Sequence, residues 1–161
     1  MSNTKNYDPK SITLSIDGQA VSGFADGTFI TVNRNNPMWS VVSGASGEHA
    51  RSKSCDKSGT IELVLMQTSE TNDLLSAYLL LDETSNSGKF PVALLDAHGG
   101  TIVGATEMWV QQAPSIEYGK ELSDRTWTLE AGHIDIFAGG TDISAAMTTL
   151  SGSIKSGSIK P

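Results

Sequence analysis

Alternation of apolar and polar residues is the feature that most constrains this fold, because it favours strands over helices along most of the chain. The segment 12–16 (ITLSI) alternates with a period of two, the spacing that places one face of a strand on a core. Asp17-Gly18 follows at once, and this pair is a strong signal for a two-residue hairpin turn. The chain is therefore predicted to begin with a β-hairpin.

Further strand-like segments follow, separated by turn residues such as Asp26-Gly27 and His98-Gly99-Gly100. They comprise 28–34, a strand that opens at Trp39, 60–66, 90–96, 101–110 and the strand region 125–140. We expect the strand at Trp39 to pair with 60–66 as a hairpin with a long loop.

The loop of that hairpin is the polar stretch 43–59 (SGASGEHARSKSCDKSG), which contains no large apolar side chain. Its seventeen residues exceed the usual length of a structureless loop. Loops this long usually bind something or are held by something.

One segment changes its period. Leu74, Leu75, Tyr78 and Leu79 recur at spacings of three and four, and Asp73 occupies the first turn, where the helix dipole favours a negative charge. Ser69 or Thr71 is a suitable cap. The pattern predicts a single helix over residues 70–83.

The segment 125–140 (RTWTLEAGHIDIFAGG) changes its buried face partway along. Trp127, Leu129 and Ala131 place apolar side chains at odd positions, whereas Ile134 and Ile136 place them at even positions. An extra residue is needed between the two sets, so we predict a β-bulge at Gly132-His133.

Composition limits the partners of the protein. The 161 residues carry 18 acidic and 11 basic side chains, a net charge of -7, and no Lys/Arg-rich run that would follow a phosphate backbone. The single cysteine, Cys55, cannot form an internal disulfide, and neither a signal peptide nor an apolar run of bilayer length is present. We expect folding in a reducing cytoplasm, with no membrane anchor and no specific nucleic-acid binding.

Motifs for catalysis or cofactor binding are missing from the sequence. The three histidines are scattered, and Cys55 lies near His49 without a third orienting group. No phosphate-binding glycine motif occurs. The three tryptophans are Trp39, Trp109 and Trp127. Because each lies in a strand with an apolar pattern, we expect them in the core or in contacts between subunits. The sequence predicts no enzyme, no cofactor and no metal site.

Composition also divides the chain into a β domain, residues 1–140, and a Ser/Gly-rich extension, residues 141–161. The extension ends in a tandem SGSIK repeat and has too few apolar residues to form a core of its own.

Four segments of the β domain match a known family in their order and spacing. They are Tyr7-Asp8-Pro9, the turn 23–27 (GFADG) with Phe29 after it, the segment 119–125 (GKELSDR) leading to Trp127, and the closing 137–140 (FAGG). Over about residues 7–140 the sequence resembles the tail tube proteins of contractile-tailed bacteriophages, a family of short tube proteins of myophages.

This resemblance implies a mainly β fold, an antiparallel β-sandwich or half-barrel with one helix, similar to the ring proteins of type VI secretion and of phage-like bacteriocins. It also implies hexameric rings whose inner wall is a continuous β-barrel, stacked into a virion tail tube after assembly in the host cytoplasm. DNA and the tape-measure protein would pass through the lumen. Sheath, baseplate and tail terminator proteins would contact the outside and the ends.

The polar stretch 43–59 is then a candidate contact between subunits or rings. Its charged residues are three basic and two acidic in an otherwise acidic protein: Glu48, Arg51, Lys53, Asp56 and Lys57. Complementary charge of this kind fixes register between partners more than it adds affinity. A solvated loop without a partner is the alternative.

Two alternative functions remain open at this point. One is a secretion-type or bacteriocin ring that carries no DNA. The other is a monomeric carbohydrate-binding β-sandwich that uses exposed tryptophans.

Overall fold

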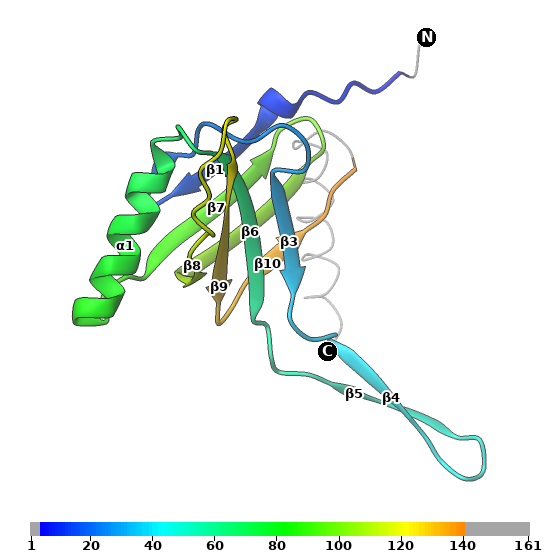
Figure 1. The fold of residues 1–161 in the computed structure, drawn as a ribbon. Coiled ribbons are helices and arrows are strands. Elements are labelled where there is room, and N and C mark those ends of the chain that lie inside the picture. Colours follow the sequence, from blue (N-terminus) through cyan, green and yellow to red (C-terminus); the bar gives the residue numbers. More distant parts are fainter. Residues whose placement is uncertain (1–3, 141–161) are drawn as a thin grey trace.

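An antiparallel sheet of eight strands and one helix make up most of the computed structural model, which describes residues 4–140 (Figure 1). The sheet has the order β2-β1-β7-β8-β9-β6-β3, and β10 pairs with β8. Its strands are β1 (Ile12–Ile16), β2 (Gln19–Ala20), β3 (Ile30–Arg34), β6 (Gly59–Met66), β7 (Phe90–Asp96), β8 (Thr101–Gln112), β9 (Asp124–Ala131) and β10 (Asp135–Phe137). A short 3₁₀ helix, Pro9–Ser11, precedes β1. The mainly β class is confirmed; the predicted extension 141–161 lies outside the described residues.

The predicted hairpin at Asp17-Gly18 is confirmed. β1 and β2 pair through Ile16 and Gln19, and both turn residues have positive φ, 51° at Asp17 and 77° at Gly18. Such a turn follows the right-handed twist of the two strands it joins.

The buried face of the sheet forms a single core. Alternate side chains of β1, β6, β7 and β9 are buried, among them Leu14, Leu63, Val92 and Leu129. The two ends of the sheet curl toward each other, so that side chains of β3 lie across a gap from those of β1 and β7. The architecture is therefore a half-barrel rather than two stacked sheets.

The expected pairing of the strand at Trp39 with 60–66 is wrong. β6 pairs with β3 on one side and with β9 on the other. The strand at Trp39 is β4 (Trp39–Ser43), and it pairs with β5 (His49–Lys53), which lies inside the stretch predicted as a loop. β6 is buried on alternate residues against its partners, whereas every residue of β4 and β5 is exposed, so the two hairpin strands do not contribute to the core.

The helix predicted over 70–83 is α1 (Thr71–Ser85). The N-cap residue is Glu70, which makes no side-chain cap hydrogen bond, so neither predicted residue occupies the cap position; the Ser69 hydroxyl oxygen accepts from the backbone N–H of Thr71 at 3.2 Å one residue before it. Leu75 is fully buried, and Leu74, Tyr78 and Leu79 pack on the same core. The three- and four-residue spacing therefore does mark the face of α1 that contacts the sheet.

Tyr78 also ties α1 to the first hairpin, because its hydroxyl donates to Asp17 Oδ2. This hydrogen bond raises the pKa of Tyr78 from 10.0 to about 12; partial burial and the Asp17 charge act in the same direction. Its contribution to stability is fully present below pH 10 and is lost as the pH rises toward 12.

Replacement of Tyr78 with Phe is expected to lower the free energy of unfolding by about 1 kcal/mol at neutral pH, since Asp17 is exposed and solvent weakens the bond. Urea unfolding of both proteins between pH 8 and pH 11.5 measures this difference. The difference in unfolding free energy should become smaller above pH 10. A difference that stays constant would show that the hydroxyl acts only through packing.

The change of buried face at Gly132-His133 is confirmed, because Ala131 and Ile134 are both fully buried while the two residues between them are exposed. The irregularity is not a one-sided bulge. Ala131 pairs with Met108 and Asp135 with Gly104, so the register against β8 is the same on both sides. β8 has its own irregularity at this level, a register shift against β7 between Phe90 and Val92. β8 and the segment that joins β9 to β10 thus each carry one extra residue at this level. The two irregularities offset each other, so the pairing register with β8 is kept.

Candidate subunit interface

The β4–β5 hairpin, residues 39–53, extends beyond the sheet as an isolated arm (Figure 1). Gly44 and Gly47 make its turn: Gly44 N–H donates to the Glu48 carbonyl at 2.8 Å, and Gly47 has a φ of 84°. The arm carries exposed apolar side chains, including Trp39, Val41 and Val42. A long exposed hairpin with apolar residues is a recognition element or an aggregation hazard.

The register gives the arm two different faces. Trp39 pairs with Lys53, and Val41 with Arg51, on one face. The Arg51 guanidinium lies 4.0 Å from the centroid of the Trp39 ring and Lys53 Nζ lies 5.9 Å from it, both within cation–π range. The opposite face carries small uncharged residues apart from Val42: Ser40, Ala50 and Ser52. The arm therefore presents one cationic, aromatic face and one neutral face.

The five charged residues predicted for the interface do not form one cluster. Arg51 and Lys53 share the cationic face, and Glu48 lies beside the turn. Asp56 and Lys57 lie instead at the base of the arm. Asp56 accepts from Ser58 N–H at 2.9 Å and from Asn36 Nδ2 at 2.6 Å.

These contacts at the base have two consequences. The Ser58 backbone and side chain, followed by Asn36, hold the pKa of the Asp56 carboxyl below its ordinary value. The Lys57 carbonyl accepts from Ile134 N–H at 2.9 Å and so joins the base to the strand break before β10. Asp56 and Lys57 thus make their contacts within the subunit, at the base of the arm.

β3 forms one border of the sheet and leaves backbone groups unpaired. Val64 N–H donates to the Phe29 carbonyl, and Asn35 N–H donates to the Ser58 carbonyl. Since bonding alternates along an antiparallel strand, the N–H groups of Ile30, Val32 and Arg34 point away from β6. At the other border, β2 pairs with β1 at Ser15 and Ile16, and Val21 N–H donates to the Leu14 carbonyl at 2.8 Å, so only part of β1 is paired on this side. Both borders are open in the part of the chain that the structure describes.

The exposed face of the sheet carries no Lys or Arg on its described strands. Its side chains are mainly Thr, Ser and small apolar residues, such as Thr31 and Ala93, with acidic groups at Glu62 and Glu130. Lys89, just before β7, lies 3.6 Å from Glu107 Oε2. The strands therefore present a neutral to acidic surface.

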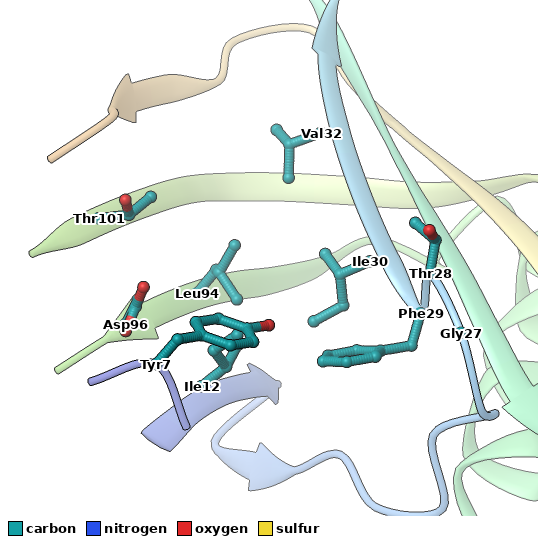
Figure 2. A pocket seen from close by; sticks show the side chains of 10 residues that line it. All are labelled: Tyr7, Ile12, Gly27, Thr28, Phe29, Ile30, Val32, Leu94, Asp96 and Thr101. Atoms are coloured by element: carbon teal, nitrogen blue, oxygen red, sulfur yellow. The ribbon is translucent and has the colours of Figure 1, made fainter. Parts of the chain in front are cut away.

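Between the two borders lies an apolar pocket of about 350 Å³ (Figure 2). In Figure 2, Ile30 and Val32 of β3 lie opposite Leu94 of β7 and Ile12 of β1, with Phe29 close by. These side chains come from three separate parts of the sequence, residues 12, 29–32 and 94, and no local pattern marks the pocket.

The other candidate residues do not come together. Trp127 is buried and donates to Asn72 Oδ1 at 2.9 Å, whereas only Trp39 is exposed, so no tryptophan platform forms. His49 contacts Ser43 and His133 contacts Asp135, both at 3.0 Å, and Cys55 is an exposed free thiol. Among residues 4–140 no group of His, Cys, Asp or Glu suits a metal ion, and no helix is long and apolar enough to cross a membrane.

Sequence reasoning missed β5, the open border at β3 and the apolar pocket. One local signal for β5 exists. The segments on either side of the glycines at 44 and 47, residues 39–43 and 49–53, have equal length and can pair residue for residue. The other two features depend on which strands become neighbours.

Known proteins with similar sequence or fold are structural parts of phages and related particles. A structural protein, ORF10, of Pseudomonas phage KPP10 is 23% identical over 145 residues, which cover 85% of this chain and 84% of that protein. The anti-feeding prophage tube-terminating cap superposes with a TM-score of 0.61 at 10% identity, over 86% of this chain and 95% of the other. A chain of a native gene transfer agent virion gives 0.57 at 11% identity, over 83% and 100%.

The sequence model of the bacteriophage PhiTE tail tube protein family matches residues 10–139, nearly the whole of the described chain. The matched segment contains the curved sheet, α1 and the arm. The chain therefore belongs to the bacteriophage PhiTE tail tube protein family, and it is a structural, non-enzymatic subunit of a virion tail tube.

Proposed function

We propose that six copies of this subunit close into a ring through their sheet borders and that the rings stack into a hollow tube. The observation that carries this proposal is the pair of open borders, at β3 and at β1–β2. Backbone groups at a border favour pairing with another strand. Two different borders make a head-to-tail contact, which closes into a ring when the rotation fits.

The exposed face of the sheet then lines the bore. DNA that leaves a capsid must slide without being held, and Lys and Arg hold phosphates by releasing counterions. The strands of this face carry Glu62 and Glu130 and no basic residue. A neutral to acidic wall would pass DNA and the tape-measure protein without specific binding.

The arm reaches a neighbouring subunit or the next ring. Its cationic face, with Arg51 and Lys53 around Trp39, is suited to an acidic surface, and the chain as a whole is acidic, with a net charge of -7. Glu48 at the turn would add a charge of opposite sign at the tip. Asp56 and Lys57 would act indirectly, by fixing the direction of the arm at its base.

Other tail proteins complete the assembly in this proposal: sheath outside, baseplate and terminator proteins at the ends. The similarity of the fold to a tube-terminating cap supports contacts of this kind at a tube end. Family membership favours a phage tube that carries DNA over a secretion-type or bacteriocin ring without DNA.

A reconstruction of the assembled tube by electron microscopy tests this function. We expect six-fold rings with Thr31, Glu62 and Thr128 facing the lumen and a bore of neutral to negative potential. A predominantly basic bore, or a lumen lined by α1, would contradict the proposal.

A further inference from the structure

The apolar pocket between β3 and β1–β7 is a groove that the described residues leave open. The groove is lined by Tyr7, Ile12, Phe29, Ile30, Val32 and Leu94. Tyr7 is 72% exposed at its rim. Apolar surface of this kind is usually covered in a soluble protein or its assembly.

The groove has an apolar floor and few polar groups. The one charged residue in its lining is Asp96, whose Oδ1 accepts from Gly99 N–H at 3.0 Å and lies 3.4 Å from the Ser11 hydroxyl. Since that carboxylate already has partners within the subunit, the groove does not select a cation. Its chemistry fits apolar side chains.

The described chain ends at the rim of this groove. After β10, Gly139 N–H donates to the Thr101 hydroxyl at 3.2 Å, and Thr101 also lines the groove. Lys5 Nζ lies 3.4 Å from the Gly140 carbonyl. Gly140, the last described residue, therefore lies beside the groove, and three residues can span about 10 Å when extended.

The sequence beyond Gly140 supplies suitable side chains within that reach. Ile143, Met147 and Leu150 lie within eight residues, and no charged residue falls among them. The family model ends at residue 139, so this segment is not part of the pattern shared by the family.

We propose that residues 143–150 occupy the apolar groove of their own subunit, with Ile143, Met147 and Leu150 covering Ile30, Val32 and Leu94. The extension then covers apolar surface that the half-barrel leaves open between its two borders. The occupant belongs to the same chain because the chain leaves β10 at the wall of the groove.

Disulfide trapping in the full-length chain tests this assignment. In a Cys55→Ser background, Val32→Cys is combined with Met147→Cys, and mild oxidation is followed by mass spectrometry of the linked peptides. The first control pair combines Val32→Cys with Ser158→Cys. The second combines Met147→Cys with Thr126→Cys, which lies on the exposed face of the sheet. We expect an intramolecular disulfide with a yield about tenfold above both controls. A yield equal to the controls, or a disulfide formed between two chains, would overturn the proposal.

A second measurement avoids any change in the groove. Ile143→Asp with Leu150→Asp is compared with Ser151→Asp plus Ser156→Asp, which adds the same charge. Both pairs lie beyond Gly140 and leave every core side chain intact. Fluorescence of a dye that binds exposed apolar surface should rise severalfold only in the first pair; equal fluorescence in both would count against occupancy of the groove.

Discussion

Replacing Val32 with proline is expected to abolish ring and tube formation while the subunit still folds. The Val32 N–H points away from β6, so proline removes no hydrogen bond of the subunit's own ladder. The same substitution removes a hydrogen-bond donor from the border of the sheet. It also places the pyrrolidine ring of proline where a neighbouring strand would pair. Negative-stain images and sedimentation velocity of the purified variant measure the outcome.

The matched control is Val32→Ala, which removes both γ-methyl groups of the side chain and keeps the N–H. This variant is expected to form tubes, with some loss of stability because Val32 packs against the core. Circular dichroism establishes that both variants fold. Normal tubes from a folded Val32→Pro variant would show that this border does not take part in assembly.

Reversing two charges on the arm, Arg51→Glu with Lys53→Glu, is expected to shorten the tubes strongly or to prevent them. Both side chains lie over Trp39, and reversal replaces a cationic face by an acidic one in a protein of net charge -7. Like charges placed together at an interface cost several kcal/mol. Tube length in negative-stain images is the readout, and every residue of the arm strands is exposed, so folding should be unaffected.

Two controls separate a specific contact from a general effect of charge. Lys10→Glu with Lys120→Glu changes the net charge by the same amount at exposed positions outside the arm and should leave tube length closer to normal. Arg51→Lys keeps the charge and should retain most assembly. Tubes of ordinary length from the arm double variant would contradict the role of the cationic face.

Local structure could be read from the sequence wherever neighbouring residues decide it. The turn at Asp17-Gly18 follows from residues that tolerate positive φ, and α1 follows from the three- and four-residue apolar spacing between Leu74 and Leu79. The change of face between Ala131 and Ile134 was visible in the same way. The matching irregularity in β8 could not be predicted, because the burial of Ala105 and Met108 depends on the strands beside them.

Pairing between distant segments was harder to predict, and the arm is the clearest case. The strand at Trp39 and the strand 60–66 follow each other along the chain, which favours a hairpin, yet β6 finds its apolar partners in β3 and β9. β5 contains charged and small residues and has weak strand propensity. It forms because the turn at Gly44 and Gly47 brings it against β4.

The sequence marks the charged residues of the candidate interface but not their arrangement. In the sequence, Arg51 and Lys53 stand out by their charge alone, because their shared position over Trp39 depends on the register of the β4–β5 hairpin. Asp56 and Lys57 lie near them in the sequence, but their contacts are at the base of the arm. The groove could not be predicted at all, because it exists only once the two ends of the sheet curl together.

Hydrogen exchange at β3 tests the central claim most directly. The amides of Ile30, Val32 and Arg34 face outward from the sheet and should exchange rapidly in isolated subunits. In assembled tubes they should become strongly protected, because a strand of the next subunit accepts their hydrogen bonds. Amides that stay fast in tubes, or that are already slow in a stable single subunit, would contradict the claim that identical copies complete this sheet.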